Sequence, residues 1–179
     1  MPDLELMILE LPYIFGSMPG RKPLWAPLIG YLSWPIPLFY TGGGTNMVAV
    51  KQVAEAIVGA LEQGKGGERY VVGDENLTWN DLLSRLSALI GLPKRAITLP
   101  NVLVQAAMHM VHLIHKWQGR EGGLNMLEFI KLQTANTFFD PAPSRQALGY
   151  GQGGLAEALR DTVKACLPRR RLADPRGNT

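Results

Sequence analysis

Short apolar runs alternate with amphipathic helical segments along most of the chain. Residues 4–11 form a nearly continuous apolar run that ends at Pro12, as is typical of a strand covered on both faces. Residues 47–50 and 68–72 are further strand candidates, and the sequence between them predicts a helix that ends at Gly64. Strands and helices that alternate in this order predict an α/β fold.

Apolar stripes of helical period mark the faces that the helices should bury. The helix after residues 47–50 should bury six positions: Val50, Val53, Ala54, Ile57, Val58 and Leu61. Thr78 with Asp81 three residues later resembles a capping box, and it opens a predicted helix that ends at Gly91. Residues 101–117 and 124–135 predict two more helices.

Length and composition predict one ordinary globular domain. The chain has 179 residues, of which 46% are hydrophobic and 18% charged, so it can build a real core. Its net charge of +3 owes much to the run from Arg169 to Arg171, which is typical of a solvated tail because no basic residues interleaved with aromatics support it elsewhere. We therefore expect a domain over residues 1–168, a basic, disordered tail over residues 169–179, and no nucleic-acid partner.

Neither a membrane span nor a secretory signal is expected. The longest apolar stretch, residues 102–114, is too short to cross a bilayer and contains Gln105, His109 and His112. The amino terminus has no basic segment and no small-residue cleavage site. Cys166 is the single cysteine, so no disulfide framework exists, and a cytoplasmic location is expected.

The segment "LGYGQGGLAEAL" contains the spacing Gly149-x-Gly151-x-x-Gly154 of a dinucleotide-binding turn. That motif requires a buried strand before its first glycine and an acidic residue about 20 positions later. Here residues 141–147 contain two prolines and cannot be a central strand, and the downstream acid would be Asp174 in the polar tail. We do not expect a nucleotide site at these glycines.

Three histidines lie on one predicted helix, at positions 109, 112 and 115. Two steps of three residues rotate His115 about 120° from His109, because each helical residue turns about 100°. No cysteine can join them, and the nearby acids are Glu121 and Glu128. We therefore expect no metal site.

Residues 16–45 form a long Gly- and Pro-rich excursion, and such loops are usually functional or covering segments. Arg21 and Lys22 either hold an anionic substrate group or belong to a solvated loop. Four aromatic residues either line an apolar pocket or cap the core: Trp25, Trp34, Phe39 and Tyr40. Glu10 ends the apolar run, so its carboxylate should face a cleft or have a partner. The spacing reveals no catalytic constellation.

The stretches "LELMILELPYIFG" and "GGGTNMVAVKQVAEAIVGALEQGKGGERYVVGDENLTWNDLLSRLSALIG" resemble the second half of an extended or atypical short-chain dehydrogenase/reductase. The most similar group is that of NAD-dependent epimerases/dehydratases and dihydroflavonol-reductase-like proteins, and its features follow in family order over nearly all of residues 4–167. The resemblance implies the carboxyl-terminal part of a Rossmann-like α/β fold. A few parallel strands and a mostly helical substrate lobe are expected, without the amino-terminal cofactor half.

The resemblance also implies a function and a set of binding residues. The parent activity is NAD- or NADP-dependent reduction, epimerisation or dehydration of a hydroxylated small molecule. Residues 17–40 would cover the substrate. The resemblance assigns the cofactor's nicotinamide to Pro12, Tyr13 and Ile14. It places six residues near the substrate: Glu10, Phe15, Arg21, Lys22, Trp25 and Asn46.

Two parts of the family pattern have no counterpart in these 179 residues. Family members carry a glycine-rich turn and a Tyr-x-x-x-Lys catalytic pair upstream of the segment that matches Leu4, and no tyrosine here has Lys four residues later. We expect no cofactor binding or catalysis by this chain alone, as a truncated product, a fragment or one piece of a split enzyme. Alternatively, it is a non-catalytic module that docks a partner, or itself, through an exposed sheet edge.

Overall fold

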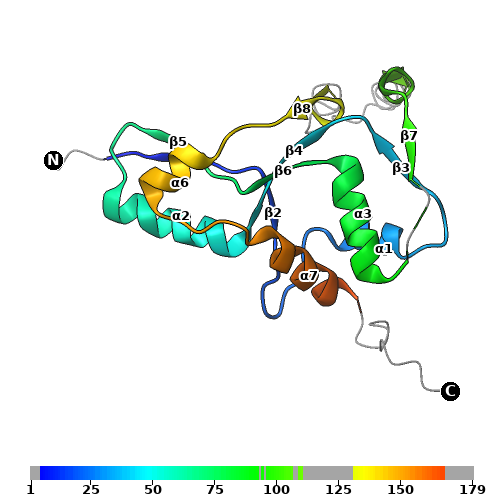
Figure 1. Ribbon diagram of the computed structural model, residues 1–179, viewed down its shortest axis with the longest axis horizontal. Helices are drawn as coiled ribbons and strands as arrows, with labels where there is room; N and C mark the ends of the chain where they lie inside the picture. Colours follow the sequence, from blue (N-terminus) through cyan, green and yellow to red (C-terminus); the bar gives the residue numbers. More distant parts are fainter. Residues whose placement is uncertain (1–4, 93, 95, 107–108, 111–130, 168–179) are drawn as a thin grey trace, which may run out of the picture.

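The computed structural model describes residues 5–92, 94, 96–106, 109–110 and 131–167 and has the predicted α/β fold (Figure 1). The strands are β1 (Ile8–Glu10), β2 (Tyr13–Phe15), β3 (Leu38–Thr41), β4 (Gly44–Ala49), β5 (Arg69–Val71), β6 (Glu75–Thr78), β7 (Ala96–Leu99) and β8 (Asn136–Thr137). The helices are α1 (Ala26–Leu32), α2 (Val50–Gln63), α3 (Trp79–Ile90), α6 (Ala142–Leu148) and α7 (Leu155–Cys166). The predicted tail over residues 169–179 and most of the predicted helices over residues 101–135 lie outside the described residues.

Most of the described strand pairs are parallel. β1 pairs with β5, with Leu9 opposite Tyr70, and β2 pairs with β4, with Ile14 opposite Val48. β8 also runs parallel to β4, and β3 runs parallel to β7, whereas β6 is antiparallel to β4. The parallel pairs agree with the expected partial Rossmann-like arrangement.

The apolar run at residues 4–11 does not form the single strand that its pattern predicts. The chain makes two short strands, β1 and β2, which pair with different neighbours on either side of Leu11 and Pro12. Proline lacks an N–H group and interrupts a strand ladder, which explains the change of partner. The prediction of burial on both faces was also wrong: Met7 and Leu9 pack against the core, but Ile8 and Leu11 are exposed.

Helix α2 buries a different face from the predicted one. Val53, Ala56 and Ala60 are buried, whereas Leu61 is 76% exposed. The other predicted positions, Val50, Ala54, Ile57 and Val58, are exposed as well. Close packing explains the difference, because a Cβ atom added at Gly59 would lie 1.9 Å from the Leu148 carbonyl oxygen of α6. The small residues allow neighbouring elements to pack closely against α2, and its large apolar side chains stay exposed to solvent.

Strand β4 separates two hydrophobic cores. Successive strand residues point to opposite sides, so Met47 and Ala49 enter the first core and Val48 the second. The first core lies among β2, β4, α1, α3 and α7, and its largest members include Phe15, Ile29, Leu32, Leu82, Leu86, Leu155 and Leu159. The second lies under α2 and contains Val53, Ala56, Ala60, Tyr70, Val72, Leu148 and Tyr150. Both cores depend on contacts between distant parts of the chain.

The predicted ends of α3 are confirmed. The Thr78 side chain accepts a hydrogen bond from the Asp81 N–H group at 3.1 Å, which satisfies one free amide at the start of the helix. Gly91 follows the helix in the left-handed conformation, with φ of 77°.

Candidate functional site

A pocket of about 610 Å³ opens where the chain changes from the β1–β5 pair to the β2–β4 pair. One wall comes from residues 10–13, which end β1 and begin β2. The opposite wall comes from residues 132–139, which include β8. The lining residues are Glu10, Leu11, Pro12, Tyr13, Thr45, Val71, Trp79, Leu132, Gln133, Thr137 and Phe139. Ligands of open α/β sheets bind where neighbouring strands diverge, so this position favours a binding site.

Tyr13 and Gln133 form the polar part of this pocket. The Gln133 side-chain amide donates a hydrogen bond to the Tyr13 hydroxyl. The Gln133 carbonyl accepts from the Trp79 indole N–H at 2.7 Å and from the Thr41 hydroxyl at 3.1 Å. The Tyr13 ring packs between Trp25 and Trp79, with ring centroids 5.4 and 5.5 Å away. These contacts hold a hydroxyl and an amide in fixed positions beside apolar walls.

Glu10 lies at the edge of this pocket and has the partner that its position in the sequence predicts. Its carboxylate is 3.3 Å from the Arg69 guanidinium on the neighbouring strand β5. The Arg69 side chain is 68% exposed and that of Glu10 47%, so the pair contributes little to folding. Glu10 therefore remains available to contact a ligand.

The structure brings three of the predicted site residues together: Glu10, Pro12 and Tyr13 line the same pocket. Ile14 packs against the second core, and its carbonyl accepts a hydrogen bond from the Trp25 indole at 2.7 Å. Phe15 is completely buried and stacks on Trp25 at 4.5 Å. Trp25 thus caps the core at this point.

The remaining predicted site residues do not line the pocket. Arg21 and Lys22 are exposed on the loop before α1. Asn46 is completely buried, next to Thr45 in the pocket wall. The roles predicted for these three residues remain predictions. Of the histidines, His109 is exposed, and the other two lie outside the described residues; no group of potential metal ligands occurs among the residues that the structure describes.

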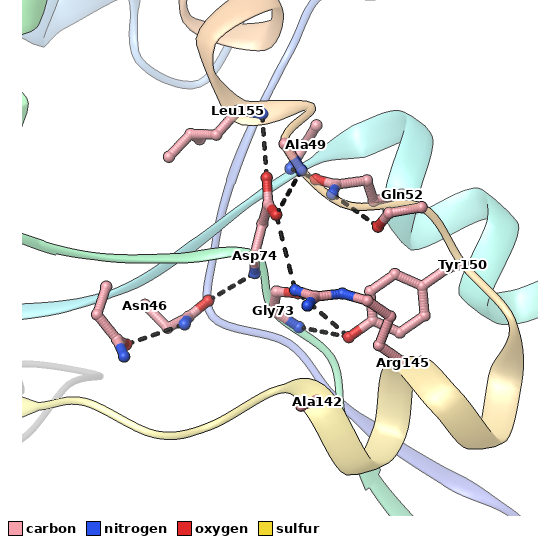
Figure 2. Close-up of polar contacts among 12 residues, drawn as sticks. Asn46, Ala49, Gln52, Gly73, Asp74, Ala142, Arg145, Tyr150 and Leu155 are labelled. Carbon is pink, nitrogen blue, oxygen red and sulfur yellow. Dashed lines mark hydrogen bonds and ion pairs between the residues drawn. The ribbon is translucent and has the colours of Figure 1, made fainter.

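Asp74 is the centre of a buried polar network that the sequence analysis missed (Figure 2). Its carboxylate accepts hydrogen bonds from the backbone N–H groups of Gly153 at 2.8 Å and Leu155 at 3.2 Å, and lies 3.7 Å from the Arg145 guanidinium. Its own N–H group donates to the Asn46 side-chain oxygen at 2.9 Å. With 3% of its side chain exposed, Asp74 joins the end of β5 to the start of α7.

Side-chain hydrogen bonds of Tyr150 and Gln52 also fix the connection between α6 and α7 (Figure 2). The Tyr150 hydroxyl accepts from the Gly73 N–H at 3.2 Å and donates to the Gly73 carbonyl at 3.1 Å. Gln52 accepts from the Ala49 N–H and donates to the Gly151 carbonyl, each at 3.0 Å. The segment "LGYGQGG" is therefore a packed connection between α6 and α7.

The glycine spacing in this segment has a structural explanation. Gly149 ends α6 in the left-handed conformation, with φ of 68°. The Gly151 N–H donates to the Glu55 carboxylate at 3.0 Å, and Asp74 occupies the amides of Gly153 and Leu155. Carboxylates of the chain itself therefore take the place that phosphate oxygens occupy in a dinucleotide turn. The adjoining cleft of about 400 Å³ also contains the carboxylates of Glu55, Glu157 and Asp161 and one lysine, Lys51.

Cys166 lies at the end of α7, packs against the first core and is half-buried. Burial raises the pKa of its thiol, because a thiolate is poorly solvated there. A raised pKa leaves less of the nucleophilic thiolate at neutral pH, as expected of an unreactive cysteine.

The family models contain no match to this chain. A protein of Synechocystis sp. named after its likeness to dihydroflavonol 4-reductase is 29% identical over 128 residues, which are 69% of this chain and 37% of the relative. The crystal structure of gox2253 is 25% identical with a TM-score of 0.69, and the match covers 89% of this chain and 48% of that one. The resemblance to extended short-chain dehydrogenases/reductases is confirmed.

Two further solved structures share the fold. PA4631, a nucleoside-diphosphate-sugar epimerase from Pseudomonas aeruginosa, is 21% identical with a TM-score of 0.63 over 90% of this chain and 48% of its own. UDP-glucuronic acid 4-epimerase from Bacillus cereus, solved in complex with NAD, is 18% identical with a TM-score of 0.56 over 90% and 45%. The chain thus spans half or less of each of these relatives. None of its described helices is long and apolar enough to cross a membrane.

Proposed function

We propose that this chain forms the substrate-binding half of an NAD- or NADP-dependent reductase, epimerase or dehydratase that acts on a hydroxylated small molecule in the cytoplasm. The observation that carries the proposal is the pocket at the β1–β2 break, where the Tyr13 hydroxyl and the Gln133 amide lie beside aromatic walls. The relatives named for reductase and epimerase activity support the reaction class.

In this proposal the two sides of the pocket have different tasks. The backbone of residues 12–14 approaches the nicotinamide end of the cofactor, as the family resemblance implies. Tyr13 and Gln133 bind a substrate hydroxyl or carbonyl, and Glu10 contacts the substrate at the rim. The apolar residues of the pocket, which include Trp79 and Phe139, exclude water from the bound substrate.

The residues of this chain do not fit a complete dinucleotide. A pyrophosphate needs free backbone amides at a helix amino terminus, and the glycine-rich segment uses the amides of Gly151, Gly153 and Leu155 for the chain's own carboxylates. The nicotinamide end alone would gain a few hydrogen bonds of about 1 kcal/mol each, against about 8 kcal/mol for micromolar affinity. No Tyr-x-x-x-Lys pair occurs in the sequence either. We therefore assign no chemical step to this chain alone.

Two-dimensional NMR with two probes, dihydroquercetin and UDP-glucose, tests the pocket. The Trp79 indole N–H donates to the Gln133 carbonyl, so a ligand in the pocket should shift its resonance, whereas that of the exposed Trp34 should stay in place. We expect Tyr13→Phe and Gln133→Leu each to weaken binding about tenfold, since each removes one hydrogen bond of about 1.4 kcal/mol.

Tyr40→Phe is the matched control, because that hydroxyl bonds to Thr98 at 2.7 Å and does not line the pocket. The proposal fails if neither probe shifts the Trp79 resonance. It also fails if Tyr40→Phe weakens binding as much as Tyr13→Phe does.

A second candidate function is a non-catalytic docking module. The observation that favours it is the row of large apolar side chains on the outer side of α2, where Leu61 is the most exposed. A chain of this kind would bind a protein partner and leave the Trp79 resonance unchanged with both small-molecule probes.

A further inference from the structure

Phe139 is the last residue of the pocket wall formed by residues 132–139. Its side chain lines the pocket and is half-buried. A Cβ atom added at Gly73, in the loop between β5 and β6, would lie 2.8 Å from the Phe139 Cε2 atom. The ring therefore packs directly on the Gly73 backbone, and its place in the pocket depends on this close contact.

The Asn76 side chain holds the backbone of Phe139 with two hydrogen bonds in opposite directions. Its amide nitrogen donates to the Phe139 carbonyl at 2.9 Å, and its oxygen accepts from the Phe139 N–H group at 3.4 Å. β8 ends two residues earlier, at Thr137. Asn76 thus offers Phe139 one donor and one acceptor, as a residue of a neighbouring strand would. The two bonds fix the position of the peptide groups on both sides of Phe139.

Asn46 determines which way the Asn76 amide points. The Asp74 N–H group can only donate, so it fixes the Asn46 side-chain oxygen on its own side, at 2.9 Å (Figure 2). The Asn46 amide nitrogen then donates to the Asn76 oxygen, also at 2.9 Å. Because this oxygen faces Asn46, the Asn76 nitrogen is left for the Phe139 carbonyl. Asn46 is completely buried, so solvent does not compete for its bonds.

We propose that Asn76, oriented by Asn46, is a positioning residue that holds Phe139 as the specificity-determining wall of the pocket. This inference rests on the proposed function, in which the pocket binds the substrate. Asn46 is among the residues that the family resemblance places near the substrate, and here it acts through Asn76 and Phe139 without substrate contact. Release of the Phe139 backbone should let the ring leave Gly73, so that the wall no longer fits the substrate.

A double-mutant cycle tests whether Asn76 acts through Phe139. The Trp79 indole resonance reports the dissociation constant of the tighter-binding probe, dihydroquercetin or UDP-glucose, for the parent, Asn76→Ala, Phe139→Ala and the double variant. We expect Phe139→Ala to weaken binding about tenfold, because it removes an aromatic contact, and Asn76→Ala to weaken it by less. The double variant should bind as Phe139→Ala does, because Asn76 then has no wall to hold. Asn136→Ala is the matched control and should bind as the parent does, since Asn136 is an exposed residue of β8 that does not line the pocket.

A measurement without ligand separates this inference from the proposed function. The nuclear Overhauser effect between the Phe139 ring and the Gly73 α-protons should be strong in the parent and in Asn136→Ala, and weaker in Asn76→Ala. Because Asn76 is exposed, Asn76→Ala should fold as the parent does, which circular dichroism checks.

Two results overturn the inference. One is an additive cycle, in which the double variant binds more weakly than Phe139→Ala by the factor that Asn76→Ala alone causes. The other is an unchanged Overhauser effect in Asn76→Ala. A parent that binds neither probe contradicts the proposed function and the specificity role, whereas a weakened Overhauser effect would still show that Asn76 positions Phe139.

Discussion

Asp74 shows how much of the structure depends on a single buried side chain. The carboxylates of Asp74 and Glu55 accept hydrogen bonds from backbone N–H groups of residues 151–155, at the start of α7. These residues lie 79 to 96 positions away in the sequence. Composition and periodicity report local preferences, and neither indicates that the acid after β5 meets this loop. A long separation in the sequence also explains why Gln133 was not predicted. It lies 120 residues from Tyr13, its hydrogen-bond partner in the pocket. Glu10, by contrast, could be identified because a carboxylate at the end of an apolar run is unusual by itself.

We predict that Asp74→Asn lowers the free energy of unfolding by about 3 kcal/mol. The variant leaves Arg145 without its buried partner and weakens two charge-assisted hydrogen bonds, each worth about 1.5–3 kcal/mol. Urea denaturation at neutral pH measures the change. Glu157→Gln, at an exposed position on α7, should change the free energy by less than about 0.5 kcal/mol. Equal effects of the two substitutions would show that Asp74 does not hold the loop.

At the scale of the elements, the sequence indicated which segments fold but not always which face they bury. The two ends of α3 match the expectation, because capping residues act locally. The buried face of α2 does not match the expectation, because this helix has apolar residues on two sides. The small residues Ala56, Gly59 and Ala60 pack closely, and larger residues occupy the other side. Hydrophobic periodicity favours the larger residues, whereas the closeness of α6 and the sheet selects the smaller ones.

The close approach of α2 and α6 makes a prediction about Gly59. Gly59→Ala should lower the free energy of unfolding by about 1–3 kcal/mol, because the added methyl would overlap the Leu148 carbonyl. Gly30→Ala in α1 is the matched control, since a Cβ there meets no atom within 4 Å. It should raise stability by up to about 1 kcal/mol through helix propensity. Thermal denaturation compares the two variants, and a stabilising Gly59→Ala would mean that the two helices are not in close contact.

At the scale of the molecule, the two cores on either side of β4 support two pairs of parallel strands. These pairs diverge at Leu11 and Pro12, and the pocket opens at that point. The fold class follows from the alternation of strands and helices in the sequence. The pocket does not, because it requires residues 10–13 and 132–139 to meet.

In the proposed function, this chain holds the substrate side of a dinucleotide-dependent enzyme and not the site for the cofactor's pyrophosphate. Calorimetric titration of the 179-residue chain with NAD⁺, NADH, NADP⁺ and NADPH tests it most directly. We predict no measurable binding of any of the four, because carboxylates of the chain occupy the amides of its glycine-rich loop. Tight 1:1 binding of one form would contradict the account and would place the nucleotide at residues 149–154.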